Sequence, residues 1–199
     1  FKTQIRAMLQ AGYNANLNIL LPMITSSDEI QKAKELINDV KIDLKKDKKK
    51  FTDKYKLGIM IEIPASALQA DELSKQVDFM SIGTNDLVQY TLAIDRIDDE
   101  VSNLYDPTNP SVLALIKKVI NSCNKSKINV TVCGEMAGEV LYTKLLLGLG
   151  LKSFSMHPQA MPEVKNIIIK SDTSRIRRKI SAILKCNDIS KRKELIKSL

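Results

Sequence analysis

The chain has 199 residues, of which 44% are hydrophobic and 27% charged, as in an ordinary globular domain. No apolar run approaches the roughly 20 residues of a membrane helix, and no signal peptide is recognisable, so we expect a cytoplasmic protein without membrane contact. The three cysteines lack the spacing of a zinc site or a disulfide framework. The net charge of +8 is dispersed and aromatic residues do not alternate with the basic runs, so nucleic acid is not an expected partner.

The predicted elements alternate between helices and strands in chain order. A helix over 1–11 comes first, and strands are expected at 17–24, 56–63, 77–82, 128–133 and 153–156. Helices are expected at 26–44, at 64–73, from the turn at 83–86 through 91, and at 111–124, 139–149 and 161–169, followed by a basic helical tail over 173–199. This alternation predicts an α/β fold with a parallel sheet.

The number of strands sets the expected architecture. A complete (β/α)₈ barrel has eight strands and about 250 residues, whereas this sequence supports about five βα units and begins within a helix without Met. We therefore expect a partial TIM-type barrel that lacks the N-terminal strands, formed by residues 1–170, with residues 171–199 as a helical basic tail packed on it. An open doubly wound sheet is the alternative, although the GxGxxG turn typical of it is absent.

Three short segments, each an apolar run with polar residues at its end, carry the candidate chemistry. They are GIMIEIP at 58–64, FMSIGTNDL at 79–87 and NVTVCGE at 129–135. In (β/α) barrels the active site is built at the carboxyl ends of the strands. We therefore expect the polar residues of these segments to meet at one rim, as in an enzyme: Glu62, Asn85, Asp86 and Cys133.

Glu62 lies in an otherwise apolar strand, which predicts a buried carboxylate that needs a partner. Asp86 follows the neighbouring strand, and Mg²⁺ in proteins takes one or two carboxylates together with substrate and water oxygens. We therefore expect Glu62 and Asp86 to hold a divalent cation. A structural ion pair between Glu62 and a lysine or arginine is the alternative.

Asn85 and Arg96 are the candidates for contact with an anion. Asn85 follows a Gly-Thr pair in a turn that can present backbone N–H groups and the side-chain amide to a phosphate; an N-cap to the next helix is the alternative. The planar guanidinium of Arg96 suits phosphate or carboxylate. A surface ion pair with Asp95 or Asp98 is equally compatible with the sequence.

Cys133 ends a predicted strand directly before a glycine. A protonated thiol can act as a general acid at neutral pH, so a proton donor or nucleophile at the barrel mouth is the functional interpretation. A buried packing residue is the alternative. Cys123 and Cys186 lie on predicted helix faces and are expected to pack. His157, the sole histidine, has no acidic residue nearby in the sequence and is interpreted as structural.

Longer motifs containing these residues resemble the phosphoenolpyruvate-utilising enzyme family. They are GIMIEIPA at 58–65, DFMSIGTNDLVQYTLAIDR at 78–96 and CGEMAG at 133–138. The run YTLAIDR, with LYDP at 104–107 and PSVL at 110–113, is most similar to the branch formed by Enzyme I of the bacterial sugar phosphotransferase system, the phosphoenolpyruvate–protein phosphotransferases. The resemblance extends over residues 1–170.

The resemblance implies a TIM barrel that binds Mg²⁺ and phosphoenolpyruvate (PEP), forms a homodimer and releases pyruvate. The phosphoryl group passes in that family to a histidine on a separate domain and then to the carrier protein HPr. Matched by motif, Glu62 and Asp86 resemble the Mg²⁺ ligands, with Asp86 also at the substrate. Asn85 and Arg96 resemble the phosphate contacts, and Cys133 the acid that protonates the enolate carbon.

The sequence also departs from that family. The phospho-accepting histidine and its domain are absent, as are the early strands that supply further arginines, so we expect this chain alone not to complete phosphotransfer to HPr. One alternative is a relative of pyruvate phosphate dikinase or PEP synthase, which would need a nucleotide-binding domain upstream. The other is a catalytically silent dimerisation or regulatory module, which would have no use for the buried carboxylates.

Overall fold

The computed structural model describes residues 1–95 and 98–199. Its strands are β1 (Asn18–Leu21), β2 (Lys56–Ile61), β3 (Phe79–Gly83), β4 (Asn129–Cys133) and β5 (Ser153–Phe154). The α-helices are α1 (Lys2–Ala11), α2 (Ser27–Lys46), α3 (Pro64–Leu68), α4 (Ala70–Leu73), α5 (Thr84–Leu92), α6 (Pro110–Ser126), α7 (Glu135–Gly138), α8 (Val140–Leu149), α9 (Met161–Lys170), α10 (Thr173–Leu184) and α11 (Ile189–Lys197). Short 3₁₀ turns lie at Ser102–Leu104 and Pro158–Ala160.

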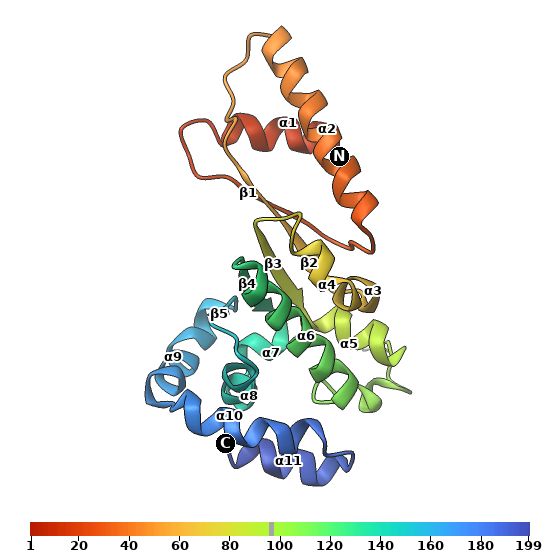
Figure 1. Cartoon of the computed structure of the whole chain (residues 1–199), viewed down its shortest axis with the longest axis vertical. Coiled ribbons are helices and arrows are strands. Elements are labelled where there is room, and N and C mark those ends of the chain that lie inside the picture. The colour runs from red at the N-terminus through yellow and green to blue at the C-terminus, as the bar shows by residue number, and fades with distance from the viewer. Residues whose placement is uncertain (96–97) are drawn as a thin grey trace.

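The five strands form one parallel sheet whose order, β1-β2-β3-β4-β5, follows the chain. A doubly wound sheet reverses its strand order at a switch point, so that alternative is wrong. Sequential parallel strands joined through helices are the arrangement of a (β/α) barrel. Figure 1 shows the elements following one another from the N-terminal helices at one end of the long axis to α10 and α11 at the other. The sheet is not closed, and the prediction of a partial barrel is confirmed.

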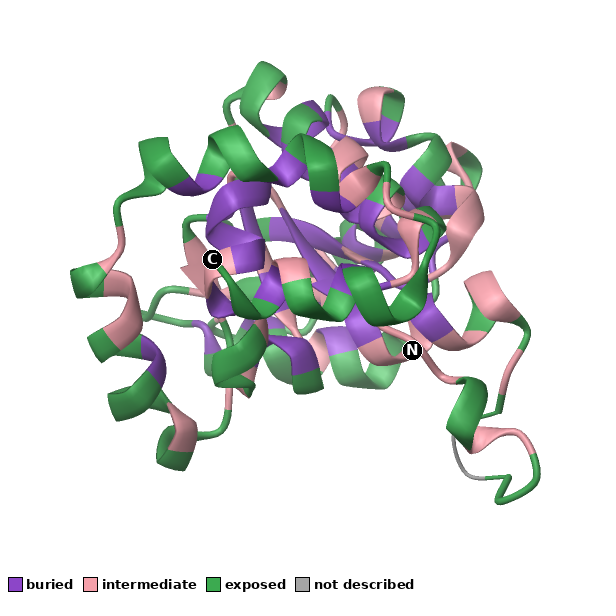
Figure 2. Ribbon diagram, turned by 90° about the horizontal axis from the view of Figure 1, so that it is seen from below, coloured by how far each residue is buried: buried purple, intermediate pink, exposed green. Residues whose placement is uncertain are grey.

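The apolar runs form the strands because both faces of a parallel sheet are covered. Four of the six residues of β2 and four of the five residues of β3 are buried, and buried residues gather along the strands and the inner faces of the surrounding helices (Figure 2). In α2, which begins with a capping box formed by Ser26 and Glu29, the buried positions repeat at helical spacing on one side. None of the helices in residues 1–95 and 98–199 is long and apolar enough to cross a membrane.

Three helical segments differ from the expected ones. The helix expected over 64–73 is two helices separated at Gln69, whose side chain donates hydrogen bonds to the backbone oxygens of Ala65 and Thr25. The helical tail is also interrupted, because the carboxylate of Asp188 accepts from the N–H of Lys191 and starts a new helix there. The short helix α7, directly after β4, was not expected.

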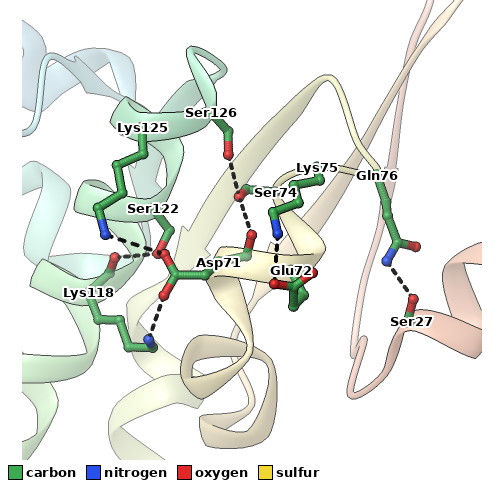
Figure 3. Close-up of polar contacts among 10 residues, drawn as sticks. All are labelled: Ser27, Asp71, Glu72, Ser74, Lys75, Gln76, Lys118, Ser122, Lys125 and Ser126. Carbon is green, nitrogen blue, oxygen red and sulfur yellow. Dashed lines mark hydrogen bonds and ion pairs between the residues drawn. The ribbon is translucent and has the colours of Figure 1, made fainter.

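A polar network joins α4 to α6 on the outside of the sheet (Figure 3). The Asp71 carboxylate accepts hydrogen bonds from Lys118 Nζ at 3.0 Å and Ser122 Oγ at 2.8 Å, with Lys125 Nζ 3.9 Å away. The hydrogen bond from Lys118 is the largest cause of a lowered pKa at Asp71. The network fixes the segment after β2 against the helix that leads to β4.

The C-terminal helices share the core of the sheet domain. Ile176, Ile180 and Ile183 of α10 are buried, and a Cβ on Gly148 of α8 would collide with the Ile180 side chain. Complete burial of one isoleucine side chain contributes about 1.5–3 kcal/mol. Residues after 173 therefore add to the stability of the same packed unit.

Candidate active site

The register of the sheet places three positions side by side at the carboxyl ends of the strands. Ile61 pairs with Ile82, so Glu62 comes next to Gly83, and Gly83 pairs with Cys133. Neighbouring strands lie about 4.8 Å apart, and Gly83 therefore separates Glu62 from Cys133 by one strand. A Cβ on Gly83 would lie 3.1 Å from Oε2 of Glu62. The absence of a side chain at this position leaves room for the carboxylate.

Glu62 is buried, with 4% of its surface exposed. Its Oε1 accepts a hydrogen bond from the backbone N–H of Met23 at 2.7 Å, which comes from the segment after β1. Burial raises the pKa of Glu62, and the Asp86 carboxylate raises it further through its negative charge and a side-chain hydrogen bond. Among the described residues no lysine or arginine forms an ion pair with Glu62, so the structure does not provide the predicted alternative there.

The facing carboxylates of Glu62 and Asp86 suit a hard divalent cation. Two such groups repel each other unless a proton or a cation lies between them, and oxygen donors are the ligands that Mg²⁺ and Ca²⁺ prefer. Outside residues 96–97, no group of three or more His, Cys, Asp or Glu side chains is arranged to hold a metal ion. Mg²⁺ in proteins commonly takes one or two carboxylates and completes its shell with substrate oxygens and water.

Asn85 lies in the first turn of α5, but it does not cap that helix. The N-cap residue is Gly83, and Asn85 Oδ1 instead accepts from the backbone N–H of Glu135 at 2.9 Å. The Tyr105 hydroxyl donates to the backbone oxygen of Asn85 at 3.3 Å. With its oxygen bonded to Glu135, the amide of Asn85 has its NH₂ group as a donor, which is the kind of group a phosphate oxygen accepts from.

Gly134 brings the ends of β3 and β4 close together. Its φ of +90° lies in a region that L side chains rarely adopt, and a Cβ there would lie 2.6 Å from Thr84 Oγ1 and 2.7 Å from Asn85 Oδ1. Thr84 Oγ1 donates to the backbone oxygen of Cys133 at 2.8 Å. Only glycine therefore permits this close approach of the two turns without strain.

The thiol of Cys133 lies between two strands at the edge of a cavity. Its Sγ accepts from Ser81 Oγ at 3.3 Å and donates to the backbone oxygen of Ile82 at 3.4 Å. The cavity has a volume of about 420 Å³. Its lining residues are Asn85, Cys133, Gly134, Glu135, Gly138, Ser155, Met156, His157 and Ala160. Of the predicted site residues, Asn85 and Cys133 line this cavity, whereas Glu62 and Asp86 are not among its lining residues.

Two residues that were not predicted as site residues lie at this cavity. His157 lies on the cavity with its Nδ1 accepting from the N–H of Gln159 at 3.5 Å, and Glu135 supplies the N–H that orients Asn85. The position of Glu135 in the CGEMAG motif was the available signal, whereas no sequence signal marked His157. The predicted anion ligand Arg96 lies outside the described residues.

Cys123 and Cys186 lie away from this rim. Cys123, on α6, is fully buried, and burial raises the pKa of its thiol to about 12. Cys186 lies between α10 and α11, where its Sγ donates to the backbone oxygen of Asp188. Neither thiol belongs to the cavity beside Cys133.

Comparison of this chain with known folds and sequences identifies its class of protein. A citrate lyase from Burkholderia xenovorans superposes with a TM-score of 0.61 over 92% of this chain and 56% of that one, at 15% identity, which supports the TIM-barrel-like fold. Residues 1–173 match the family described as PEP-utilising enzyme, PEP-binding domain. The architecture and the polar rim are those of a barrel-type enzyme.

The chain belongs to the PEP-utilising enzymes, as their PEP-binding domain. The phosphoenolpyruvate-protein phosphotransferases of Listeria monocytogenes and Mycoplasma pneumoniae are 47% and 50% identical to it over 87% and 85% of the chain. That of Priestia megaterium is 41% identical over 100% of the chain. These matches cover 30%, 29% and 35% of the respective relatives, so the chain spans about a third of their length.

Proposed function

We propose that this chain is the PEP-binding catalytic domain of a phosphoenolpyruvate–protein phosphotransferase. The single observation that carries the proposal is the row Glu62–Gly83–Cys133 at the strand ends, which joins a carboxylate pair on one side to a thiol and a cavity on the other. In the proposed reaction the bond between phosphorus and the enol oxygen of PEP breaks and a bond to a histidine nitrogen forms. The enolate that remains gains a proton at carbon and becomes pyruvate.

Mg²⁺ is the proposed cation, held by Glu62 and Asp86. The Glu62 carboxylate is buried and the partly exposed Asp86 carboxylate repels it, which supports this assignment, because a cation offsets both the desolvation of Glu62 and the repulsion. A bound divalent cation would offset negative charge on the phosphate and on the enolate oxygen. The Glu62 carboxylate is held in place by the N–H of Met23, from the segment after β1.

Asn85 and Arg96 are the proposed contacts of the phosphate, and Asp86 is proposed to lie at the substrate as well. The amide of Asn85 is oriented before substrate binds, because Glu135 N–H holds its oxygen. A donor fixed in this way stabilises developing charge without reorganising during the reaction. The role of Arg96 rests on the family motif.

Cys133 is the proposed acid for the enolate. Its thiol borders the cavity, and the contacts with Ser81 and Ile82 hold it at the carboxyl end of β4. Transfer of the thiol proton to the enolate carbon forms the methyl group of pyruvate, and solvent returns a proton to the sulfur. A positioned acid of this kind contributes about 10²–10⁴-fold to a rate.

The partners and the setting are also proposals. The relatives' name, phosphoenolpyruvate-protein phosphotransferase, indicates a protein acceptor. We therefore propose a histidine on a separate domain and the carrier HPr as successive acceptors in cytoplasmic sugar uptake, with a homodimer as the working form. The sheet residues 1–170 would provide the site, and residues 171–199 would pack on them.

The proton step can be tested without a phosphoryl acceptor. The chain is incubated with Mg²⁺ and pyruvate in D₂O, and loss of the methyl proton signal is followed by NMR. We expect exchange catalysed by the chain, and a rate at least about 10²-fold lower for Cys133→Ser, while Cys186→Ser serves as the matched control and exchanges normally. Equal exchange by Cys133→Ser, or none by the unmodified chain, would contradict the assignment.

A further inference from the structure

A buried arginine lies in the last helix, beyond the residues that match the family. Arg192 of α11 is 1% exposed, and the family match ends at residue 173. Full burial is rare for arginine unless the guanidinium is paired. Its contacts therefore identify what the last helix holds in place.

The three side-chain hydrogen bonds of Arg192 all lead outside its own helix. Its Nη2 donates to Asp106 Oδ2 at 2.6 Å, across 86 residues of chain, and its Nε lies 3.4 Å from Thr108 Oγ1. Its Nη1 donates to the backbone oxygen of Cys186 at 2.9 Å. The guanidinium fork thus joins α11 to the connection between α5 and α6.

The Asp106 carboxylate, which accepts from Arg192, also bonds to the segment between α5 and α6. Asp106 Oδ1 accepts from the N–H of Thr108 at 3.0 Å and from its hydroxyl at 2.6 Å. The Asp106 side chain is only 15% exposed. With one oxygen on Arg192 and the other on Thr108, the carboxylate fixes the backbone just before α6.

Tyr105, one residue before Asp106 on the same connection, contacts the candidate site. The hydroxyl of Tyr105 donates to the backbone oxygen of Asn85 at 3.3 Å, and Asn85 in turn accepts from Glu135 N–H. The connection, between Leu92 and Pro110, also contains Arg96 in the sequence. A shift of this segment would therefore disturb the amide that faces the phosphate.

We infer that Arg192 is a positioning residue for the candidate site, acting from the C-terminal helix through Asp106 on the segment that carries Tyr105. The inference rests on the proposed function for its ligand, PEP. It gives the tail over 171–199 a role in substrate binding besides its contribution to the core. Arg192 contacts neither substrate nor cation in this account.

The test compares the full chain with four single variants and with the double variant Arg192→Lys/Tyr105→Phe. Arg192→Lys keeps the positive charge but loses the planar guanidinium with its several donors, and Arg192→Met removes both the charge and the donors. Tyr105→Phe removes only the hydroxyl that contacts Asn85, and Lys193→Met is the control, because it makes the same charge change at an exposed neighbour on α11. PEP affinity with Mg²⁺ is measured by calorimetry, and the Asn85 and Glu135 amide signals are measured by NMR without ligand.

We expect Arg192→Lys and Tyr105→Phe to weaken PEP binding about tenfold, which corresponds to about 1.4 kcal/mol, and to move the Asn85 signals. Combining them should weaken binding no further, because both act on one contact. Lys193→Met should change neither readout. Should Arg192→Met not fold, the Lys and Phe variants decide the matter alone.

Unchanged PEP affinity in Arg192→Lys and Tyr105→Phe would overturn the inference. A chain that binds no PEP at all would refute the proposed function instead. In that case the ligand-free Asn85 signals decide the inference: movement in Arg192→Lys but not in Lys193→Met supports it, and unmoved signals overturn it.

Discussion

The backbone N–H of Met23 donates to Oε1 of Glu62 across 2.7 Å and so joins the end of β1 to the end of β2. Met23 has a φ of 56°, in the left-handed region that residues other than glycine seldom occupy. Such conformations cost free energy and tend to lie at functional sites. The turn after β1 is thus part of the candidate site, because it holds the carboxylate proposed to bind the cation.

The capping box of α2 stabilises this turn, and Glu29→Ala tests it. Glu29 Oε2 accepts from the N–H groups of Thr25 at 2.6 Å and Ser26 at 3.0 Å. Loss of such a cap costs about 1 kcal/mol of unfolding free energy. Glu35→Ala, an exposed change on the same helix, is the control. Urea unfolding at neutral pH should show the loss for Glu29→Ala and a smaller one for Glu35→Ala.

At acidic pH the unmodified chain and Glu29→Ala should have the same free energy of unfolding. The hydrogen bond from Thr25 N–H is the main cause of a pKa of Glu29 below its ordinary value of 4.5. A carboxyl group with a lowered folded pKa stabilises the fold above its ordinary pKa, and this stabilisation is lost as the pH falls through the folded pKa. Urea unfolding at several acidic pH values should therefore show the two curves converging. A constant difference across that range would show that the cap does not depend on the charge.

The close approach at Gly134 predicts a large effect of one added methyl group. In Gly134→Ala the Cβ would meet Thr84 and Asn85 at a φ of +90°, so we expect a loss of about 1–3 kcal/mol in stability and weaker PEP binding. Gly138→Ala is the matched control for stability, because its Cβ would lie 3.5 Å from its nearest neighbour. Thermal unfolding and calorimetry measure both effects. Equal behaviour of the two alanine variants would contradict the described packing.

The three thiols should react with iodoacetamide in a defined order. The thiolate is the reactive form, and burial raises the pKa of Cys123 to about 12, so Cys123 should react only after unfolding. Cys133 and Cys186 are partly exposed and should react in the folded chain. PEP with Mg²⁺ should protect Cys133 but not Cys186, as measured by mass spectrometry of peptides. Protection of both, or of neither, would argue against PEP binding beside Cys133.

The sequence predicted the sheet and most of the rim because both depend on local patterns. The apolar runs before Glu62, Asn85 and Cys133 end in polar residues, and parallel strands bring such ends to one edge. The family motif added the chemical roles. The helix boundaries were less accurate: the break at Gln69 depends partly on a side-chain bond to Thr25, which lies 44 residues away.

The remaining site features depend on tertiary contacts that no local pattern encodes. Asparagine is a residue type that often caps helices, yet the side-chain oxygen of Asn85 accepts from the N–H of Glu135, 50 residues later. His157 reaches the cavity only because β5 lies beside β4. The burial of Arg192 could not be predicted from the basic, polar sequence around it. Its guanidinium is paired with the Asp106 carboxylate, which lies 86 residues away.

The most direct test of the carboxylate pair is thermal unfolding of the chain with and without Mg²⁺ plus PEP, beside Glu62→Gln and Asp86→Asn. Ligand at 100 times its dissociation constant adds about 2.7 kcal/mol to a fold that binds it. The account predicts a rise in the unfolding temperature that needs both Mg²⁺ and PEP and disappears in both variants. An unchanged transition in the unmodified chain, or an equal rise in the variants, would contradict it.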